Sequence, residues 1–305
     1  MALKAIKGKI QSVTKTRKVT KAMEAVSAVK MRKSQERALS GRPYARTAIE
    51  ILKRVAGSRE AVQHVLAEER TTSGKVLLVV VSSDKGLCGA LNANVFKAAH
   101  ALIEEHGWQS EDLLVYAIGK KAQEHFSARG FTLYAHHPSP EESAALEDVE
   151  EITEEIIGGF LGQQYDRVHM VYTNFRSTFE QEPVTRRILP ISFAALQETV
   201  NGIVPDKGKF ADQVEAPAHV STYTIEPSPE SVLSTLIPRL VAVELYHGLI
   251  EGSASEHSAR MVAMKNASDK AGEVSRELNL TYNKARQADI TQEVSEIVGG
   301  MQVSS

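Results

Sequence analysis

A glycine-rich segment, SSDKGLCGALN (residues 82–92), is the first candidate for chemistry in this chain. It joins an apolar stretch typical of a buried strand to a segment with helical periodicity. Backbone N–H groups at the start of a helix can bind a phosphate group. However, the segment fits neither G-x-x-x-x-G-K-[ST] nor G-x-G-x-x-G. A phosphate cradle and a tight turn rich in glycine are both compatible with it, and the pattern favours the turn.

Two further groups of side chains could do chemistry. Cys88, the single cysteine, could be a nucleophile at a helix start, but no histidine stands near it in the sequence. We interpret it as a buried thiol; one cysteine also excludes an intrachain disulfide. Six carboxylates lie between residues 147 and 155, but they lack the Glu-x-x-His of helical metal sites. They are interpreted as a solvated helix face.

Proline placement separates two helical ends from a mixed centre. Residues 1–42 and 239–305 contain no proline, which helix interiors exclude. In the first segment an apolar stripe runs at steps of three and four and then shifts to a second set. The stripe comprises Leu3, Ile6, Ile10 and Val13, and then Val19, Met23 and Val26. The apolar pattern predicts that this helix continues past Pro43, with its end at Gly57.

The C-terminal segment has the stronger helical pattern. Fifteen positions from 236 to 285 alternate steps of four and three, and eleven of them are apolar. This is typical of a coiled-coil seam. Small residues at 268, 271 and 275 predict a close approach of two backbones. Ser228 is the expected N-cap, with Pro229 at the first helical position.

Between the helical ends, strands alternate with helices. Strands are predicted at 75–84, 113–119, 131–137 and 167–175, with helices between them, and two later stretches could add strands. This order favours a mostly parallel, helix-covered sheet. The predicted fold is therefore α/β plus coiled coil: long antiparallel terminal helices flank an inserted Rossmann-like α/β domain. The expected bounds are 1–57 and 228–305 for the coiled-coil shaft, 75–195 for the α/β domain and 196–227 for the connection.

The two terminal helices differ in length. At about 1.5 Å per residue, residues 2–56 span roughly 80 Å and residues 230–300 roughly 105 Å. The C-terminal helix should therefore extend about 25 Å beyond its antiparallel partner. The extension carries apolar residues, and the seam slips there because the next strong apolar residue after Ala285 is Ile290. Another polypeptide is expected to cover it.

The N-terminal segment is strongly basic, and the chain has no long apolar run. Residues 1–33 carry ten Lys or Arg and one acid, distributed all round the predicted helix and without aromatic residues for base stacking. A nucleic acid and an acidic protein surface both remain open on this pattern. No apolar run reaches the roughly 18–20 residues that span a bilayer.

Three classes of function fit these features. The first is a non-catalytic shaft in a larger assembly. The second is an α/β enzyme that binds a nucleotide at residues 82–92 and uses its helices as an oligomerisation module. The third is a plain coiled-coil tether.

Three motifs resemble those of a known family. The segments KVTKAMEAVSAVKMRKSQERALSGRPYA (18–45), SSDKGLCGALNANVFK (82–97) and SARMVAMKNASDKAGEVSRELNLTYNKARQADITQEVSEIVGG (258–300) closely resemble the gamma subunits of F-type ATP synthases. They stand in the family's order, and the resemblance spans nearly the whole chain. Residues 3–30 resemble the first helix of mature family members, and the absence of a leader suggests a bacterial protein.

The resemblance implies a rotor shaft. In this family the two helices turn inside a ring of alpha and beta subunits, which makes or hydrolyses ATP. Proton flow through the membrane c ring drives the rotation. The expected partners are the alpha, beta and epsilon subunits and the c ring, with no nucleic acid and no membrane contact except through partners. No catalytic residue, cofactor or metal is expected on the chain itself. The expected location is peripheral, at the cytoplasmic face of the bacterial inner membrane.

The resemblance also implies partner-binding residues. Arg286, Gln287 and Thr291 match family positions that contact a beta-subunit loop near the top of the bearing. Met23 matches the position that faces an acidic segment of beta. Lys30, Arg32 and Lys33 would add positive charge opposite the same acidic segment. Glu226 matches a position where the family contacts the c ring.

Overall fold

The computed structural model of the protein describes residues 2–40, 64–70, 72–140, 146, 149–191 and 228–303. The chain forms two units. The helix-pair unit comprises Met1–Ser27 and Arg260–Ser305, and the α/β unit comprises Ala28–Ala259. The expected helix past Pro43 and the 196–227 connection lie outside the described residues.

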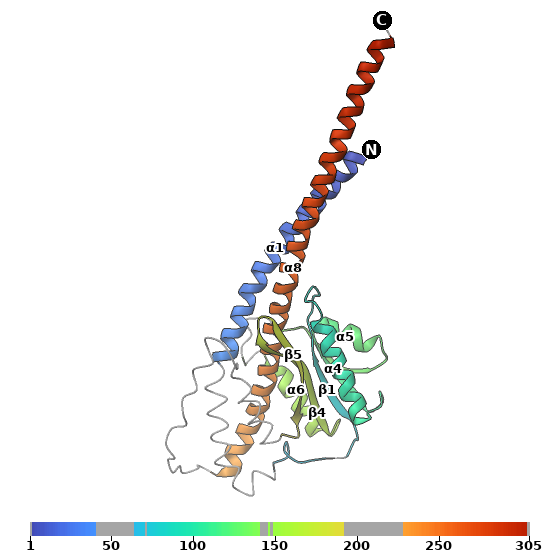
Figure 1. The fold of residues 1–305 in the computed structure, drawn as a ribbon. Coiled ribbons are helices and arrows are strands. Elements are labelled where there is room, and N and C mark those ends of the chain that lie inside the picture. Colours follow the sequence, from blue (N-terminus) through green and yellow to red (C-terminus); the bar gives the residue numbers. More distant parts are fainter. Residues whose placement is uncertain are drawn as a thin grey trace. The chain divides into compact units, whose positions relative to one another are not determined.

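The α/β unit contains a five-stranded sheet in the order β3-β2-β1-β4-β5 (Figure 1). The first four strands run parallel, and β5 pairs antiparallel with β4. The strands are β1 (Val76–Val81), β2 (Leu113–Ile118), β3 (Thr132–His137), β4 (Arg167–Ser177) and β5 (Glu180–Leu189). The helices of the α/β segment are α4 (Leu91–His106), α5 (Lys120–Ser127) and α6 (Glu150–Leu161). The predicted strands and the mostly parallel sheet are confirmed.

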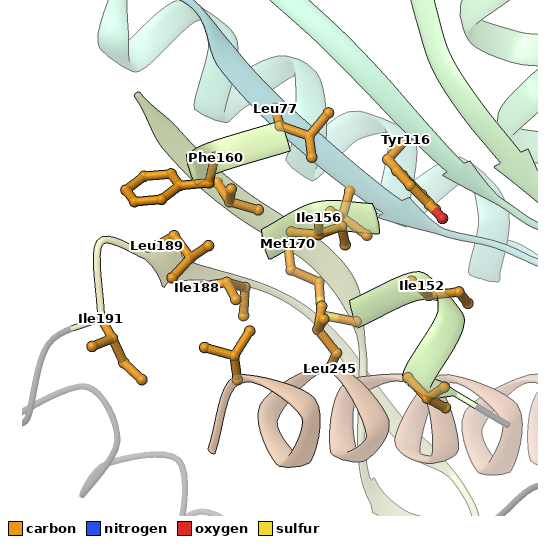
Figure 2. Close-up of a cluster of buried hydrophobic side chains, with 14 of the residues drawn as sticks. Leu77, Tyr116, Ile152, Ile156, Phe160, Met170, Ile188, Leu189, Ile191 and Leu245 are labelled. Carbon is orange, nitrogen blue, oxygen red and sulfur yellow. The ribbon is translucent and has the colours of Figure 1, made fainter. Parts of the chain in front are cut away.

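Both faces of the sheet are buried. Alternate residues of β1 point to opposite sides: Leu77 and Val79 pack with α6, while Leu78 and Val80 pack with α4 and α5. A strand covered on both faces reads as a continuous apolar run, which is why β1 is VLLVVV. Figure 2 shows the first core, where side chains of β1, β2, β4, β5 and α6 converge with Leu245.

Leu245 belongs to α8 (Pro229–Val303), a 75-residue helix. It begins as predicted: the Ser231 N–H donates to Ser228 Oγ at 3.3 Å, and Pro229 is the first helical residue. Two glycines set its distance from the sheet. A Cβ at Gly248 would lie 2.6 Å from Met170 Cε, and a Cβ at Gly252 would lie 3.1 Å from Val81 Cγ1. The sequence pattern did not reveal this role.

Among the described residues, α8 contains the one segment that is long and apolar enough to cross a membrane. One such helix is weak evidence for a membrane span, because a buried core helix of a soluble protein can be equally long and apolar. In this protein, 61% of that apolar stretch of α8 is buried against other parts of the chain.

In the helix-pair unit, α1 (Ala2–Ser40) and α8 pack against each other. A Cβ at Gly272 would lie 3.4 Å from Arg17 Nε. In the α/β unit, the Oγ atoms of Ser34 and Ser253 are 3.2 Å apart. The residue numbers of the two pairs, 17 with 272 and 34 with 253, total 289 and 287. This near-constant total is the signature of an antiparallel pairing, as predicted.

The predicted seam of α8 is confirmed by burial, because none of its fifteen positions from 236 to 285 is exposed. The second set of apolar residues on α1 is largely exposed. Val19 and Val26 are 57% and 55% exposed, and Met23 is half-buried. Thr20 and Ser27 are buried instead, since short side chains fit where two helix backbones approach closely.

Gly119 lies just after β2 and comes very close to Ser82 at the end of β1. Its φ is +87°, and a Cβ there would overlap the carbonyl oxygen of Ser82. Gly130 has a similar φ of +80° but open space around it. Gly130→Ala should therefore cost about 1–2 kcal/mol in the free energy of unfolding, from backbone strain alone.

Gly119→Ala should cost at least about 2 kcal/mol more than Gly130→Ala, because Ser82 must also move. Urea unfolding of both variants measures the difference. Equal costs would show that the contact with Ser82 is relieved without penalty.

Candidate functional site

The glycine-rich turn at 82–92 is closed by its own side chains. Asn92 Oδ1 accepts from the Ser83 N–H at 3.1 Å, and Asn92 Nδ2 donates to Ser83 Oγ at 2.8 Å. Asn92 Nδ2 also lies 3.5 Å from Cys88 Sγ. Cys88 is buried, as predicted. An anion at the Ser83 N–H would have to displace Asn92, so the geometry supports a structural turn rather than a phosphate cradle.

The acidic helix shows no metal-site geometry among the described residues. No described group of three or more His, Cys, Asp or Glu side chains could hold a metal ion. Within the run, Glu155 Oε2 accepts a 2.6 Å hydrogen bond from the Tyr116 hydroxyl. Burial and this hydrogen bond raise the pKa of Tyr116 well above its usual value. Glu155 therefore serves packing at the edge of the sheet.

The strongest candidate surface is the end of α8. The seam remains at least half-buried through Ala285, and then every residue from Arg286 to Ile297 is exposed. The helix-pair register explains this limit, because it places Ala285 opposite Leu3, near the beginning of α1. From Arg286 to Val303 the 18 residues span about 27 Å at 1.5 Å per residue. In the helix-pair unit, α8 thus runs past the start of α1 (Figure 1).

The exposed end carries its apolar residues on a new face. The positions that continue the seam are polar: Asp289, Gln292 and Glu296, of which Gln292 donates to Glu296 at 3.0 Å. The apolar side chains lie one or two residues beyond these positions, which places them about 100–200° further around the helix. This tip stripe comprises Ile290, Val294 and Ile297, which are 49%, 54% and 61% exposed. No described residue of the chain covers it.

The family-derived residues at this end are all accessible. Arg286 and Gln287 are exposed and lie on successive positions. Thr291 is exposed, but its hydroxyl donates to the Gln287 carbonyl at 2.9 Å. The hydroxyl is thus occupied within the helix, which leaves the methyl group for an apolar contact. Together these residues form a surface of one cation, one amide and weakly polar groups.

Met23 lies on a second exposed stripe of the helix-pair unit. Val19, Met23 and Val26 share a face of α1 at steps of four and three, and both valines are exposed. By register Met23 lies opposite Lys265, 21 residues before Arg286 on α8. That is about 30 Å along the helix, so Met23 and the tip belong to separate surfaces.

The remaining family-derived residues fall elsewhere. Arg32 and Lys33 are exposed and Lys30 is half-buried, all on the part of α1 that belongs to the α/β unit. Glu226 lies outside the described residues. Sequence periodicity marked the tip stripe as apolar, but only the structure shows that Val19 and Val26 are also exposed.

The exposed tip stripe predicts an unusual stability pattern. Ile290→Ala in the isolated chain should change the free energy of unfolding by less than about 0.5 kcal/mol, because Ile290 is exposed and lies outside the buried seam. Met264→Ala, at a buried seam position of the same unit, should cost about 2–5 kcal/mol. Urea unfolding monitored by circular dichroism compares the two. A large loss for Ile290→Ala would mean that the tip folds back onto the chain.

Comparison with known proteins agrees with this architecture. A family model described as ATP synthase matches residues 2–303. The ATP synthase gamma chain of Cytophaga hutchinsonii is 39% identical over 98% of this chain and 97% of its own length. That of Roseiflexus sp. (strain RS-1) is 40% identical over 97% and 96%.

Solved structures share the fold at lower identity. A chain of the Tetrahymena thermophila mitochondrial ATP synthase central stalk and c-ring structure matches with a TM-score of 0.58 and 24% identity, over 82% of this chain and 99% of that chain. A chain of the Euglena gracilis mitochondrial ATP synthase rotor matches with a TM-score of 0.60 and 15% identity, over 95% and 99%. With matched relatives and a family model that cover almost its entire length, the chain belongs to the ATP synthase gamma-chain family.

Proposed function

We propose that this chain is the central rotor shaft of an F-type ATP synthase, a non-catalytic subunit that couples c-ring rotation to ATP synthesis or hydrolysis in an alpha/beta ring. The single observation that carries the proposal is the tip stripe, exposed and uncovered by any described residue. Its relatives are named ATP synthase gamma chains, and its structural neighbours come from a central stalk and a rotor.

The helix pair suits a shaft for two physical reasons. A two-helix coiled coil with a buried seam resists bending better than a single helix. Its surface is also asymmetric, because the exposed stripes on α1 and α8 lie on separate parts of the helix pair. A shaft with such a surface presents different contacts to three surrounding sites, which is a coupling between shaft angle and site affinity.

The proposed partner contacts are those that the family resemblance implies. We assign Arg286, Gln287 and Thr291 to a beta-subunit loop around the tip and Met23 to an acidic beta segment. Lys30, Arg32 and Lys33 add positive charge on α1, opposite those acids. Glu226 is assigned to the c-ring contact, and the epsilon subunit to the α/β domain.

We assign each part of the proposed rotor to a range of the sequence. Residues 1–57 and 228–305 form the shaft, residues 75–195 the α/β domain, and residues 196–227 the connection. The chain contacts the membrane only through its partners. We place it at the cytoplasmic face of a bacterial inner membrane, where it is peripheral.

Deletion of residues 286–305 tests the role of the tip. The isolated variant should keep the wild-type unfolding free energy within about 1 kcal/mol, because residues 286–297 are all exposed. In a reconstituted synthase it should lower the torque and the ATP-driven proton pumping per ATP hydrolysed. Undiminished coupling would favour a passive tether.

Met23→Lys tests the second surface. A lysine there adds an attraction to the acidic beta segment, so the shaft should bind too tightly at one angle and pump fewer protons per ATP. Ala25→Lys is the matched control, since it adds the same charge at an exposed position about 200° around the helix. Equal coupling in the two variants would contradict the placement of Met23.

A further inference from the structure

Two histidines meet between α4 and α5, on the face of the sheet away from α8. The Nε2 atoms of His100 and His125 are 3.0 Å apart. Both residues are half-buried. The two residues are 25 positions apart in sequence and come from different helices. Nothing in the proposed rotor function uses them.

Hydrogen bonding fixes the tautomer of this pair. Arg129 NH1 lies 3.1 Å from His125 Nδ1, and a guanidinium can only donate. His125 Nδ1 therefore carries a lone pair, and the proton of the neutral ring sits on Nε2. That proton points at His100 Nε2, which must accept it. A single proton thus joins the two Nε2 atoms.

Aromatic packing holds both rings in place. Phe96 stacks on His125 with centroids 4.1 Å apart, and Phe126 stacks on His100 at 5.6 Å. Burial, and then the charge of Arg129, lower the pKa of His125 to about 4. The same two effects lower the pKa of His100. Both imidazoles are therefore neutral at pH 7, the form that binds metals.

We propose that His100 and His125 form a binding site for a divalent transition cation of the Zn²⁺, Ni²⁺ or Cu²⁺ class, in which the metal replaces the shared proton. At a metal–nitrogen distance of about 2.0–2.1 Å, two cis nitrogens lie about 2.9 Å apart in a square-planar ion and about 3.3 Å apart in a tetrahedral one. The observed 3.0 Å falls between these values. The metal would lie off the line that joins the two nitrogens, so each ring must turn by about 45° to aim its lone pair at the metal.

The surrounding charges act in opposite directions. Glu104, one helical turn from His100 on α4, raises the pKa of that ring and attracts a cation. Arg129 repels a cation and also occupies His125 Nδ1, which must gain a proton when Nε2 binds metal as a neutral ring. Arg129 is thus a competitor of the metal. Since no third described His, Cys, Asp or Glu completes the set, water would fill the other positions.

Imidazole ligands also set the selectivity. Nitrogen donors favour the transition cations over Mg²⁺ and Ca²⁺, which prefer oxygen. The site would link α4 to α5 and stabilise the α/β unit by mass action when metal is present. This inference is independent of the rotor function, because it concerns residues outside the helix pair.

Calorimetric titration of the purified full-length chain with Zn²⁺, and with Mg²⁺ as the negative control, tests the site. His100→Gln and His125→Gln should each weaken Zn²⁺ binding at least about tenfold and abolish the Zn²⁺-dependent rise in Tm. Arg129→Gln should tighten binding about threefold or more, because its competition for His125 is removed. His137→Gln should bind like the wild type; it removes the histidine that lies 3.5 Å from Glu155.

Two outcomes would overturn the proposal. One is Zn²⁺ affinity unchanged in His100→Gln or lost in His137→Gln. The other is unchanged or weaker binding in Arg129→Gln, which involves an exposed side chain and leaves both histidines intact. Circular dichroism without metal verifies that each variant is folded, and Arg129→Gln decides the matter even if a histidine variant is not.

Discussion

Close approach of the α8 backbone to its neighbours is the constraint on which both units depend. In the α/β unit, Gly248 and Gly252 let the helix lie directly on β4 and β1, where a Cβ would meet Met170 and Val81. In the helix-pair unit, Ser268, Ala271 and Gly272 are buried in the seam. Larger residues at these positions would push the backbones apart and lose the dispersion contacts of a dense interior.

The same constraint explains where sequence reasoning about the helices succeeded and where it failed. Periodicity located the α8 seam because burial recurs every 3.5 residues whatever the side chain, and no seam position is exposed. It did not reveal that Val19 and Val26 are exposed, because the pattern of apolar residues is the same for an interior and an exterior stripe. The buried positions of α1 are Thr20, Ser27, Met31 and Ser34, and three of these four have small hydroxyl side chains that suit close packing. Periodicity alone therefore cannot separate an inner seam from an outer stripe.

The α/β unit was predictable element by element but not as a whole. A strand such as β1 can be recognised in the sequence by its unbroken apolar run, because both its faces are covered. Strand order depends on which helices cross which face, and no local pattern encodes it. The His100–His125 pair was invisible for the same reason, since two residues 25 apart meet only after α4 and α5 pack on one face of the sheet.

The exposed stripes are best understood from what they do not contribute to the fold. Ile290, Val294 and Ile297 leave about half or more of their surface exposed and lie outside the buried seam, so they add little to the stability of the chain. A helix extension that only needed to be soluble would carry polar residues there, as it does at Asp289, Gln292 and Glu296. Aliphatic groups and the methyl of Thr291 make contacts without directional hydrogen bonds, and such contacts can be exchanged one for another as a surface turns. A stripe of this composition therefore suits a surface that must touch successive partners in turn and hold none of them tightly.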